Sequence, residues 1–448
     1  MPLPFQTFAA ELSFDDLPGP VLSILRRSFV DTMGVAAIGS TTGMARISRA
    51  AALSLFGVSD SGPARMLMDG RAVSPAGAAM AGAFTLDSID AHDGTSPCKG
   101  HAGSAVFPAL LAVADAQAAL GKPLDGKTFA TAIAIAYEVS YRAGLTQHAT
   151  CADYHTSGAW TAVGIAATVA RMLGGSEETI RQAAGIGEYH GPRSQMMRCI
   201  DHPTMLRDGV GWGAPSGVTA AYLAMLGFTG APALTCEGDF WSDLGSRWRL
   251  VEDTHYKPYP CCRWAHPSLD AAKALMDAHS LSYQQVEAVE IRTFHNATRL
   301  AGHTPATPDE FAYSIAFPVA AMIVRGQIGV DELAPETLND PEILRISKAT
   351  KLIDDDHFTA ISQGKRWAQV TLVLADGTRV ASEPRTPRGD TDLPLSDAEI
   401  MDKFHLFADP VLGPARANEL CDLAGRFDEL DGDGFAQLLD LCLNQPFG

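Results

Sequence analysis

The sequence predicts a mainly helical protein, with a large all-helical domain and a smaller α+β lid domain. Three observations lead to this prediction. Residues 21–228 contain successive Ala- and Gly-rich segments in which apolar residues recur with helical spacing. Residues 286–383 include runs in which apolar and polar residues alternate, as is typical of strands. Residues 396–427 return to helical spacing.

The helical domain is predicted from segments separated by glycine breakers such as Gly121, Gly174 and Gly230. Ser176 is a good N-cap, and Glu178 follows it in the first turn. The many small side chains let helices approach closely, so a compact bundle is expected. The predicted helices are residues 21–39, 75–90, 104–120, 126–145, 158–174, 176–190 and 214–228.

The character of the chain changes after residues 257–267. Residues 286–295 are predicted to form a strand, and Asp376-Gly377 is a strong hairpin signal within residues 366–383. The further predicted helices are residues 267–279, 318–327, 340–350, 396–409 and 417–427. We therefore place the helical domain at 1–265, joined by C-terminal helices at 406–448, and the α+β lid domain at 266–405.

Composition narrows the possible partners. The chain has 448 residues and 34 Lys and Arg against 52 Asp and Glu, a net charge of −18. This balance argues against nucleic acid or an anionic membrane as the main partner, although a local cationic pocket remains compatible with it. Eight cysteines are too dilute for a disulfide scaffold. With no signal-peptide pattern and no long apolar run, we expect a soluble, cytoplasmic protein.

The first candidate site lies in "DSIDAHDGTSPCKGHAGSAVFPALLAVADA", residues 87–116. Its first fifteen positions hold Asp87, Asp90, His92, Asp93, Lys99 and His101. Lys99 and His101 stand directly before a predicted helix, whose N-terminus favours anions. The alternative is a solvated loop with an N-cap. So many titratable groups between two apolar helices favour a functional cleft.

Two later stretches offer further candidates. His155 precedes a helix in "CADYHTSGAW", where it could be a catalytic residue, a cap or a surface residue. In "DHPTMLRDGVGWGAPSG", residues 201–217, Arg207 could be presented to an anionic ligand. The alternative is a tight glycine turn. The stretch lacks the Gly-Lys-Ser/Thr ending of a phosphate loop.

The segment "HYKPYPCCRWAHP", residues 255–267, is stiffened by prolines and aromatics at the predicted domain junction. It carries Lys257, Arg263 and His266, and ligand sites often lie at such junctions. The adjacent Cys261 and Cys262 have no second cysteine pair at zinc spacing. Residues suited to metal binding occur without a diagnostic spacing, so no metal is expected. They are His92, Asp93, His101, His155 and His202.

In motif order and spacing the chain resembles the MmgE/PrpD family, which includes 2-methylcitrate dehydratases, cis-aconitate decarboxylases and iminodisuccinate epimerases. The resemblance rests on "FVDTMGVAAIG", "DAHDGTSPCKGHAGSAVFPAL", "AAYLAMLGFTG" and "KPYPCCRWAHP" and covers nearly the whole chain. It implies a helical domain that carries an α+β lid. It also implies a homodimer that needs no metal or organic cofactor.

The resemblance also assigns acid–base residues of the cleft, which fall on Asp90, Thr95, His101, His155 and Lys257. The chain departs from the family pattern at two positions. Arg207 stands near a position where relatives carry lysine, and Phe317 stands where decarboxylases carry tyrosine. Both departures weaken an assignment as a decarboxylase.

These features predict a cofactor-independent lyase that acts on a small di- or tricarboxylate. Proton abstraction next to a carboxylate needs a poised base, together with cations that stabilise the developing charge. We expect a reaction like that of 2-methylcitrate dehydratase. The alternatives are an epimerase or other isomerase, a decarboxylase, a non-enzymatic carboxylate-binding protein and a metal hydrolase. The expected catalytic residues are Asp90, His101, His155 and Lys257. The expected substrate-binding residues are Asp93, Thr95, Lys99, Arg207, Arg263 and His266.

Overall fold

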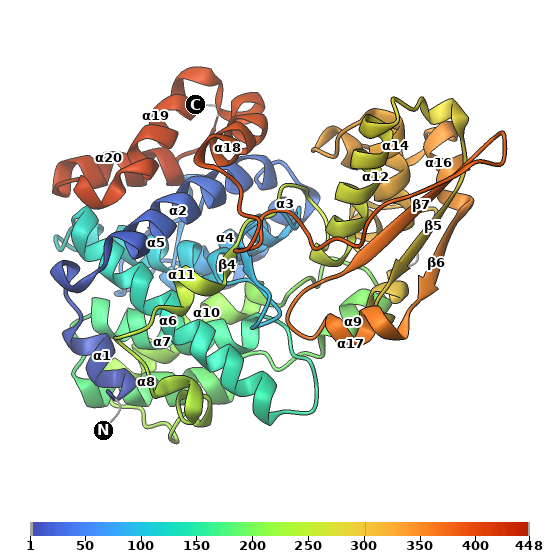
Figure 1. Ribbon diagram of the computed structural model, residues 1–448. Helices are drawn as coiled ribbons and strands as arrows, with labels where there is room; N and C mark the ends of the chain where they lie inside the picture. The colour runs from blue at the N-terminus through green and yellow to red at the C-terminus, as the bar shows by residue number, and fades with distance from the viewer. Residues whose placement is uncertain (1–2, 301, 447–448) are drawn as a thin grey trace.

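The computed structural model describes residues 3–300 and 302–446 and confirms the predicted fold class. A larger helical part and a smaller α+β part lie side by side (Figure 1). The helical part contains α1 (Phe5–Glu11), α2 (Gly19–Gly39), α3 (Gly43–Leu55), α4 (Pro75–Asp87), α5 (Gly103–Ala119), α6 (Gly126–Thr150), α7 (Gly158–Met172), α8 (Glu177–His190), α9 (Met196–Asp201), α10 (Val210–Met225) and α11 (Arg249–Asp253).

The core of the helical part is built on α5, α6, α7 and α10. All residues of α5 from Gly103 to Gln117 are buried, so this helix lies inside the bundle. Small residues allow the close packing that the sequence predicts. A Cβ added at Gly213 of α10 would lie 2.6 Å from Cα of Gly158 in α7, so only glycine permits this crossing.

The C-terminal helices return to the helical part. They are α18 (Asp397–Leu412), α19 (Pro414–Gly425) and α20 (Gly432–Leu443), and α18 lies beside α2 (Figure 1). Lys403 of α18 donates hydrogen bonds to Asp31 Oδ1 of α2 (2.7 Å) and to the Ala91 carbonyl (2.6 Å). Because α18 begins at Asp397, this return starts before the boundary that we placed at residue 405.

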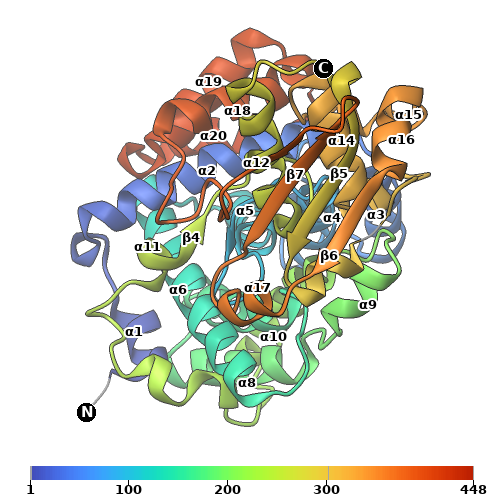
Figure 2. The same cartoon turned by 45° about the vertical axis from the view of Figure 1, so that its right-hand side comes forward.

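The α+β part is a four-stranded sheet of order β6-β5-β7-β8 with helices packed against it (Figure 2). Strand β5 (Val286–Thr293) runs parallel to β6 (Thr350–Asp354) and antiparallel to β7 (Ala368–Leu374), and β7 pairs with β8 (Arg379–Ala381). The helices are α12 (His266–Ala278), α13 (Pro308–Ala312), α14 (Ala316–Arg325), α15 (Pro335–Leu338), α16 (Pro341–Lys348) and α17 (Asp356–Ile361).

The sheet confirms two predictions and adds one strand. The hairpin turns at Asp376-Gly377 between β7 and β8, and the predicted strand at 286–295 is β5. Strand β6 was not expected, because its residues follow directly on the apolar helical pattern of α16. It starts only two residues after that helix ends.

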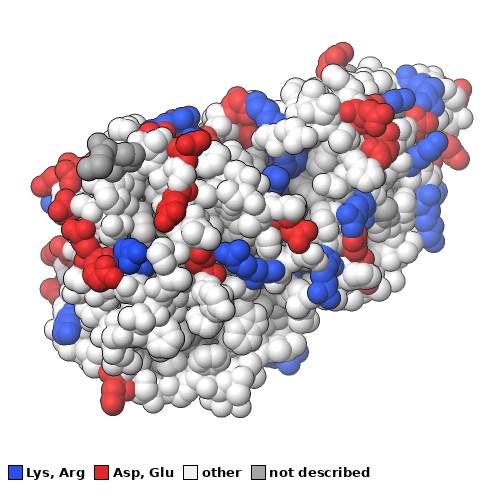
Figure 3. Space-filling view, turned by 90° about the horizontal axis from the view of Figure 1, so that it is seen from below, with Lys and Arg blue, Asp and Glu red and all other residues white. Residues whose placement is uncertain are grey.

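Two short antiparallel ribbons join loops of the helical part. The strands β1 (Ala64–Arg65) and β2 (Ala72–Val73) form the first, and β3 (Gly94–Thr95) and β4 (Thr254–His255) form the second. All eight cysteines are free thiols. Within the described ranges, no helix combines the length and the apolar character needed to cross a membrane. On the face seen in Figure 3, acidic and basic side chains are interspersed.

Candidate active site

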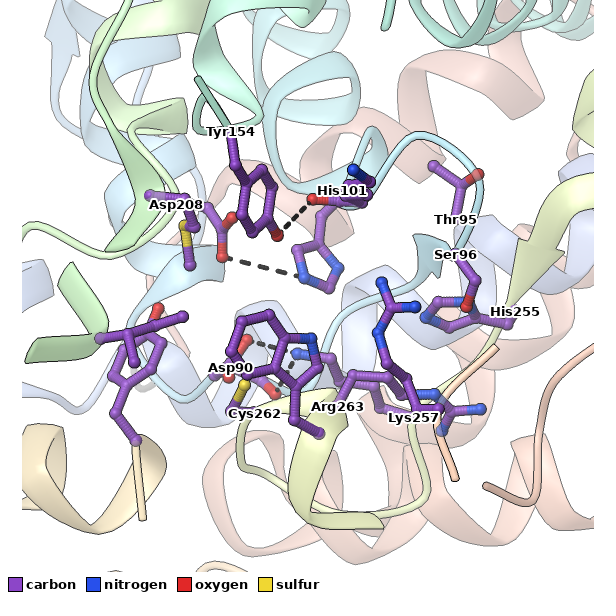
Figure 4. A pocket seen from close by; sticks show the side chains of 17 residues that line it. Asp90, Thr95, Ser96, His101, Tyr154, Asp208, His255, Lys257, Cys262 and Arg263 are labelled. Carbon is purple, nitrogen blue, oxygen red and sulfur yellow. Dashed lines mark hydrogen bonds and ion pairs between the residues drawn. The ribbon is translucent and has the colours of Figure 1, made fainter. Parts of the chain in front are cut away.

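The β3–β4 ribbon joins the two chemistry-bearing stretches of the sequence. Gly94 pairs with His255 and Thr95 pairs with Thr254, so the loop before α5 lies against the segment that contains Lys257. A cavity of ≈ 40 Å³ opens beside this ribbon (Figure 4). It is lined by Asp90, Thr95, Ser96, Lys99, Gly100, His101, Tyr154, Met196, Ile200, Asp208, His255, Lys257, Cys262, Arg263, Trp264, Tyr313 and Arg366.

His101 presents one free ring nitrogen to this cavity. Its Nδ1 lies 2.6 Å from the Asp93 carbonyl oxygen. Because a carbonyl can only accept, Nδ1 carries the proton and Nε2 carries a lone pair. Asp208 Oδ2 lies 3.8 Å from Nε2. His101 therefore has the tautomer of a general base.

Asp93 holds His101 in this orientation from behind the cavity. Its carboxylate accepts a hydrogen bond from the Tyr137 hydroxyl (2.6 Å) and one from the Gly103 N–H (3.0 Å) at the start of α5. A side chain at Gly103 would collide with both groups, at 2.5 and 2.6 Å. Burial raises the pKa of Asp93 to about 6. Asp93 was predicted to bind substrate, but it lies behind the cavity lining, where it is placed to position His101.

The surroundings keep His101 unprotonated. Burial, the Lys257 ammonium and the neighbouring His92 together lower the pKa of His101 well below its ordinary value. The His92 and His101 rings meet edge to face, with centroids 4.4 Å apart. At neutral pH, His101 is therefore a neutral base.

His92 lies on the other side of that contact and has the opposite tendency. Its Nε2 lies 3.1 Å from Asp87 Oδ1 and its Nδ1 lies 3.2 Å from the Asp93 carbonyl. Burial alone lowers the pKa of His92, but the hydrogen bond to Asp87 and the charge of Asp90 outweigh burial, so the pKa is raised overall. With acceptors at both nitrogens, His92 is suited to the imidazolium form.

Lys257 brings a buried ammonium to the cavity floor. Its side chain is 0% exposed, and its Nζ donates to the Asp90 carboxylate and to the Asp90 carbonyl (3.0 Å). Asp90 has φ +52° and Lys99 has φ +55°, a left-handed conformation that non-glycine residues rarely adopt. Such conformations cluster at functional sites, where surrounding contacts hold them. Asp90, Lys99, His101 and Lys257 thus share one cavity, as do Thr95 and Arg263.

Asp208 faces His101 across the cavity (Figure 4) and was not singled out from the sequence. Burial and the nearby carboxylates of Asp87 and Asp90 raise the pKa of Asp208 to about 7. The Ser157 hydroxyl donates to Asp208 Oδ1 at 3.2 Å. Asp208 is therefore partly protonated at neutral pH and can donate a proton there.

Arg207, by contrast, points away from the cavity. Its φ is +49°, and its guanidinium pairs with Asp309 of α13 (2.7 Å) and donates to the Ser88 carbonyl (2.8 Å). Arg207 was predicted to bind substrate, whereas in the structure its contacts link the helical part to the α+β part. The turn that directs Arg207 outward directs Asp208 inward.

The Arg207–Asp309 pair leads to a stability prediction. Replacing Asp309 by asparagine leaves the buried guanidinium without its anionic partner. We expect a loss of about 3 kcal/mol in unfolding free energy, the low end for a broken buried pair, because Asp309 is 16% exposed. The pair lies outside the cavity lining, so kcat should stay within about threefold. Urea unfolding and steady-state kinetics measure both, and a large loss of kcat with unchanged stability would contradict this assignment.

Two other predicted residues do not line the cavity. His266 is fully buried behind Arg263: its Nε2–H donates to the Cys261 carbonyl (3.1 Å) and its Nδ1 accepts from Arg263 (3.2 Å). This places His266 as a support for Arg263, which also pairs with Asp390 (2.6 Å). His155 is half-buried and bridges to Gln195, while its neighbour Tyr154 faces the cavity. A direct catalytic role for His155 would require residues 151–156 to move.

Sequence reasoning missed several lining residues. His255 lies two positions before Lys257 on an extended segment, so strand alternation could have placed both on one face. Its Nε2 is buried, with no hydrogen-bond partner in the described part of the chain, and the same holds for the Tyr313 hydroxyl. Tyr313 and Arg366 enter from the α+β part, and no local pattern identifies them.

Among the described residues, a cluster of possible metal ligands lies at the cavity, but it does not form a good metal site. Ligand atoms of Asp90, His92 and His101 lie within 4.8 Å of one another. However, the Asp90 carboxylate is already paired with the Lys257 ammonium, and both His92 nitrogens have acceptor partners. A cation among them would sit beside Lys257 and displace these bonds.

Comparison with known families matches both parts of the molecule. The MmgE/PrpD N-terminal domain matches residues 4–246, and the MmgE/PrpD C-terminal domain matches residues 259–427. The chain belongs to the MmgE/PrpD family. The site of this MmgE/PrpD protein takes His101 and Asp208 from the first domain and Arg263, Tyr313 and Arg366 from the second.

The relatives of this MmgE/PrpD protein include enzymes of known name. Human cis-aconitate decarboxylase is 24% identical over 95% of this chain and 92% of its own length. The Aspergillus oryzae cis-aconitate decarboxylase-like protein oryM is 20% identical over 92% of this chain and 91% of its own length. The mouse cis-aconitate decarboxylase is 24% identical over 80% of this chain and 76% of its own length. These similarities support a lyase-type family that acts on small carboxylates.

Proposed function

We propose that this protein is a cofactor-independent lyase that removes a proton next to a carboxylate of a small di- or tricarboxylate. The observation that carries the proposal is the His101 imidazole, whose unprotonated Nε2 faces a cavity that also holds the Lys257 ammonium. A neutral base and a preorganised cation are the two groups that such a proton transfer needs.

The reaction that we propose first is dehydration of a hydroxy acid similar to 2-methylcitrate. His101 Nε2 takes the proton from the carbon beside a carboxylate, and the electron pair moves toward that carboxylate. Lys257 stabilises the negative charge that develops there. As the carbon–carbon double bond forms, the carbon–oxygen bond on the next carbon breaks. Protonated Asp208 donates to the departing hydroxyl, which leaves as water.

Decarboxylation is the second candidate, because the curated relatives carry that name. The departure at Phe317 weighs less against it than the sequence suggested. Phe317 is buried against Phe311, whereas the Tyr313 hydroxyl faces the cavity. Epimerisation is the third candidate, since it uses the same proton abstraction without loss of a leaving group.

Incubation of candidate acids with the enzyme in deuterated water tests these alternatives. Dehydration yields an alkene, decarboxylation releases CO₂, and epimerisation returns substrate labelled with deuterium at the α-carbon. Turnover should persist after treatment with EDTA. A protein that binds the acids but shows neither label nor product after long incubation would contradict an enzymatic function. Loss of activity with EDTA and its return with metal would contradict metal independence.

We also propose that the protein is a homodimer, as the family resemblance implies. The candidate face is an apolar groove that includes Ile47, Leu55, Leu206 and Trp212, each at least half exposed. The side chains that line this groove are uncharged. Each copy has a net charge of −18, so contact through an uncharged face brings the fewest like charges together. Sedimentation equilibrium should give about twice 47.5 kDa. A monomer at micromolar concentration, or a dimer unaffected by Trp212→Glu, would contradict this face.

A further inference from the structure

The cations that line the active-site cavity differ in whether a carboxylate neutralises them. Lys257 pairs with Asp90, and Arg263 pairs with Asp390. Lys99 and Arg366 have no ion pair with any residue in the described ranges. The hydrogen bonds of Arg366 go to the carbonyls of Lys365 (3.0 Å) and Ser362 (3.3 Å), and the Lys99 ammonium lies 5.7 Å from the centre of the Tyr154 ring.

These two cations come from different parts of the molecule. Lys99 belongs to the loop before α5 in the helical part, and Arg366 belongs to the segment between α17 and β7 in the α+β part. Arg366 is only 7% exposed, and Lys99 is half-buried. Burial and the charge of Arg366 lower the pKa of Lys99, and burial lowers the pKa of Arg366. The two charges therefore repel each other in a partly dry site, and an anion between them would relieve this repulsion.

We propose that Lys99 and Arg366 bind a second carboxylate of the substrate, one that takes no part in the proton transfer. This inference rests on the proposed function, in which His101 and Lys257 act on the first carboxylate. The cavity of ≈ 40 Å³ has room for only a few water molecules, so a di- or tricarboxylate enters when the two parts separate. When the helical and α+β parts close again, the second carboxylate binds Lys99 of the helical part and Arg366 of the α+β part.

A substrate for this enzyme must therefore carry at least two carboxylates. Arg366 matches a carboxylate in a two-pronged geometry, and Lys99 adds a point charge from the helical part. Because this carboxylate takes no part in the proton transfer, its contacts are the same in the ground state and in the transition state, and they contribute to KM.

Isothermal titration calorimetry with succinate and butyrate tests the pair directly. The two probes have the same number of carbons, and only succinate has a second carboxylate. We expect the wild-type protein to bind succinate at least tenfold more tightly than butyrate. Arg366→Met should weaken succinate binding by about 10–100-fold, the usual value of a charge-assisted contact, and leave butyrate within about twofold. Lys99→Met should likewise weaken succinate binding and leave butyrate binding almost unchanged.

Two variants control for structural effects. Arg366→Lys keeps the charge and should recover part of the succinate preference. Arg379→Met removes an exposed arginine of β8 that pairs with Glu290, and should leave both affinities unchanged. With the true substrate, Arg366→Met should raise KM and leave kcat within a few-fold. An equal loss for both probes, no loss, or a wild-type protein without preference for succinate would overturn the proposal.

The binding assay also separates this inference from the proposed reaction. His101→Ala should lose turnover but keep the preference for succinate. If the protein turns over no carboxylate and yet loses succinate selectivity in Arg366→Met, the proposed reaction is wrong and the second-carboxylate site stands. If the protein instead turns over a monocarboxylate with full efficiency, the proposed proton transfer stands and the second-carboxylate site is wrong.

Discussion

Replacing His101 by alanine is expected to lower kcat by about 10²–10⁴-fold, the usual contribution of a general base. The reason is that Nε2 of His101 is an unprotonated nitrogen held toward the cavity by the Asp93 carbonyl. His101→Asn is the matched variant. Its side-chain amide can keep a donor toward Asp93 but places no base at the Nε2 position. Both variants should be almost equally inactive, and His101→Asn should be the more stable, as measured by steady-state kinetics and thermal unfolding.

A rate within about threefold of wild type for His101→Asn would remove His101 from the proposed chemistry. His155→Ala belongs in the same experiment, because the sequence predicts a catalytic His155 and the structure leaves it outside the cavity lining. A small effect is the result that the observed geometry favours. A loss as large as that of His101→Ala would mean that residues 151–156 carry His155 into the cavity when substrate binds.

Replacing Lys257 by methionine is expected to lower kcat/KM by about 10²–10³-fold, the cost of one lost donor at developing negative charge. The ammonium is fully buried, and its removal also leaves the Asp90 carboxylate without its partner. A buried unpaired charge is strongly destabilising. The double variant Lys257→Met/Asp90→Asn removes both charges and separates lost catalysis from lost stability. Full activity in the double variant would contradict the role of Lys257.

The same substitution has a pH signature that does not depend on turnover. The positive charge of Lys257 helps to lower the pKa of His101, so its removal should raise that pKa. Proton NMR titration of the His101 ring measures the change in the wild-type and Lys257→Met proteins. In the wild-type enzyme, the acid limb of the kcat/KM profile should follow the lowered pKa of His101, below the ordinary histidine range. The alkaline limb should follow loss of the proton from Asp208, whose pKa is raised to about 7. If the pKa of His101 is unchanged in Lys257→Met, the charge of Lys257 does not act on His101 and this part of the site description is wrong.

Much of the fold followed from periodicity. The long helices of the helical part, the strand β5 and the β7–β8 hairpin all have local patterns. The helices α5 and α6 are buried almost all round, so their Ala-rich apolar composition marks them as core helices. Strand β6 escaped prediction because its pairing with β5 is parallel and links residues 289–293 with residues 350–354. Local sequence carries little information about such a distant pairing. The start of α18 at Asp397, by contrast, has a local signal in the sequence, the capping box formed by Ser396 and Glu399.

The predicted site residues agree with the cavity lining where titratable residues are dense and differ from it where a single backbone angle decides direction. The loop before α5 supplies Asp90, Lys99 and His101 to the cavity. Arg207 and Asp208 are adjacent in sequence, and only the left-handed turn at Arg207 determines which of them faces inward. Tyr313 and Arg366 reach the cavity through the packing of the α+β part on the helical part. No sequence pattern encodes that docking.

The contact between Lys403 and the loop before α5 has a consequence for protein synthesis. Lys403 binds the carbonyl of Ala91, which stands between Asp90 and His92, and also binds Asp31. The ribosome must therefore synthesise most of the chain before Lys403 can contact the loop that precedes α5. Residues 266–395 must be accommodated as an insertion before α18 docks on α2. A nascent chain that stops before α18 would expose the apolar side of α2 and become a substrate for chaperones and proteases.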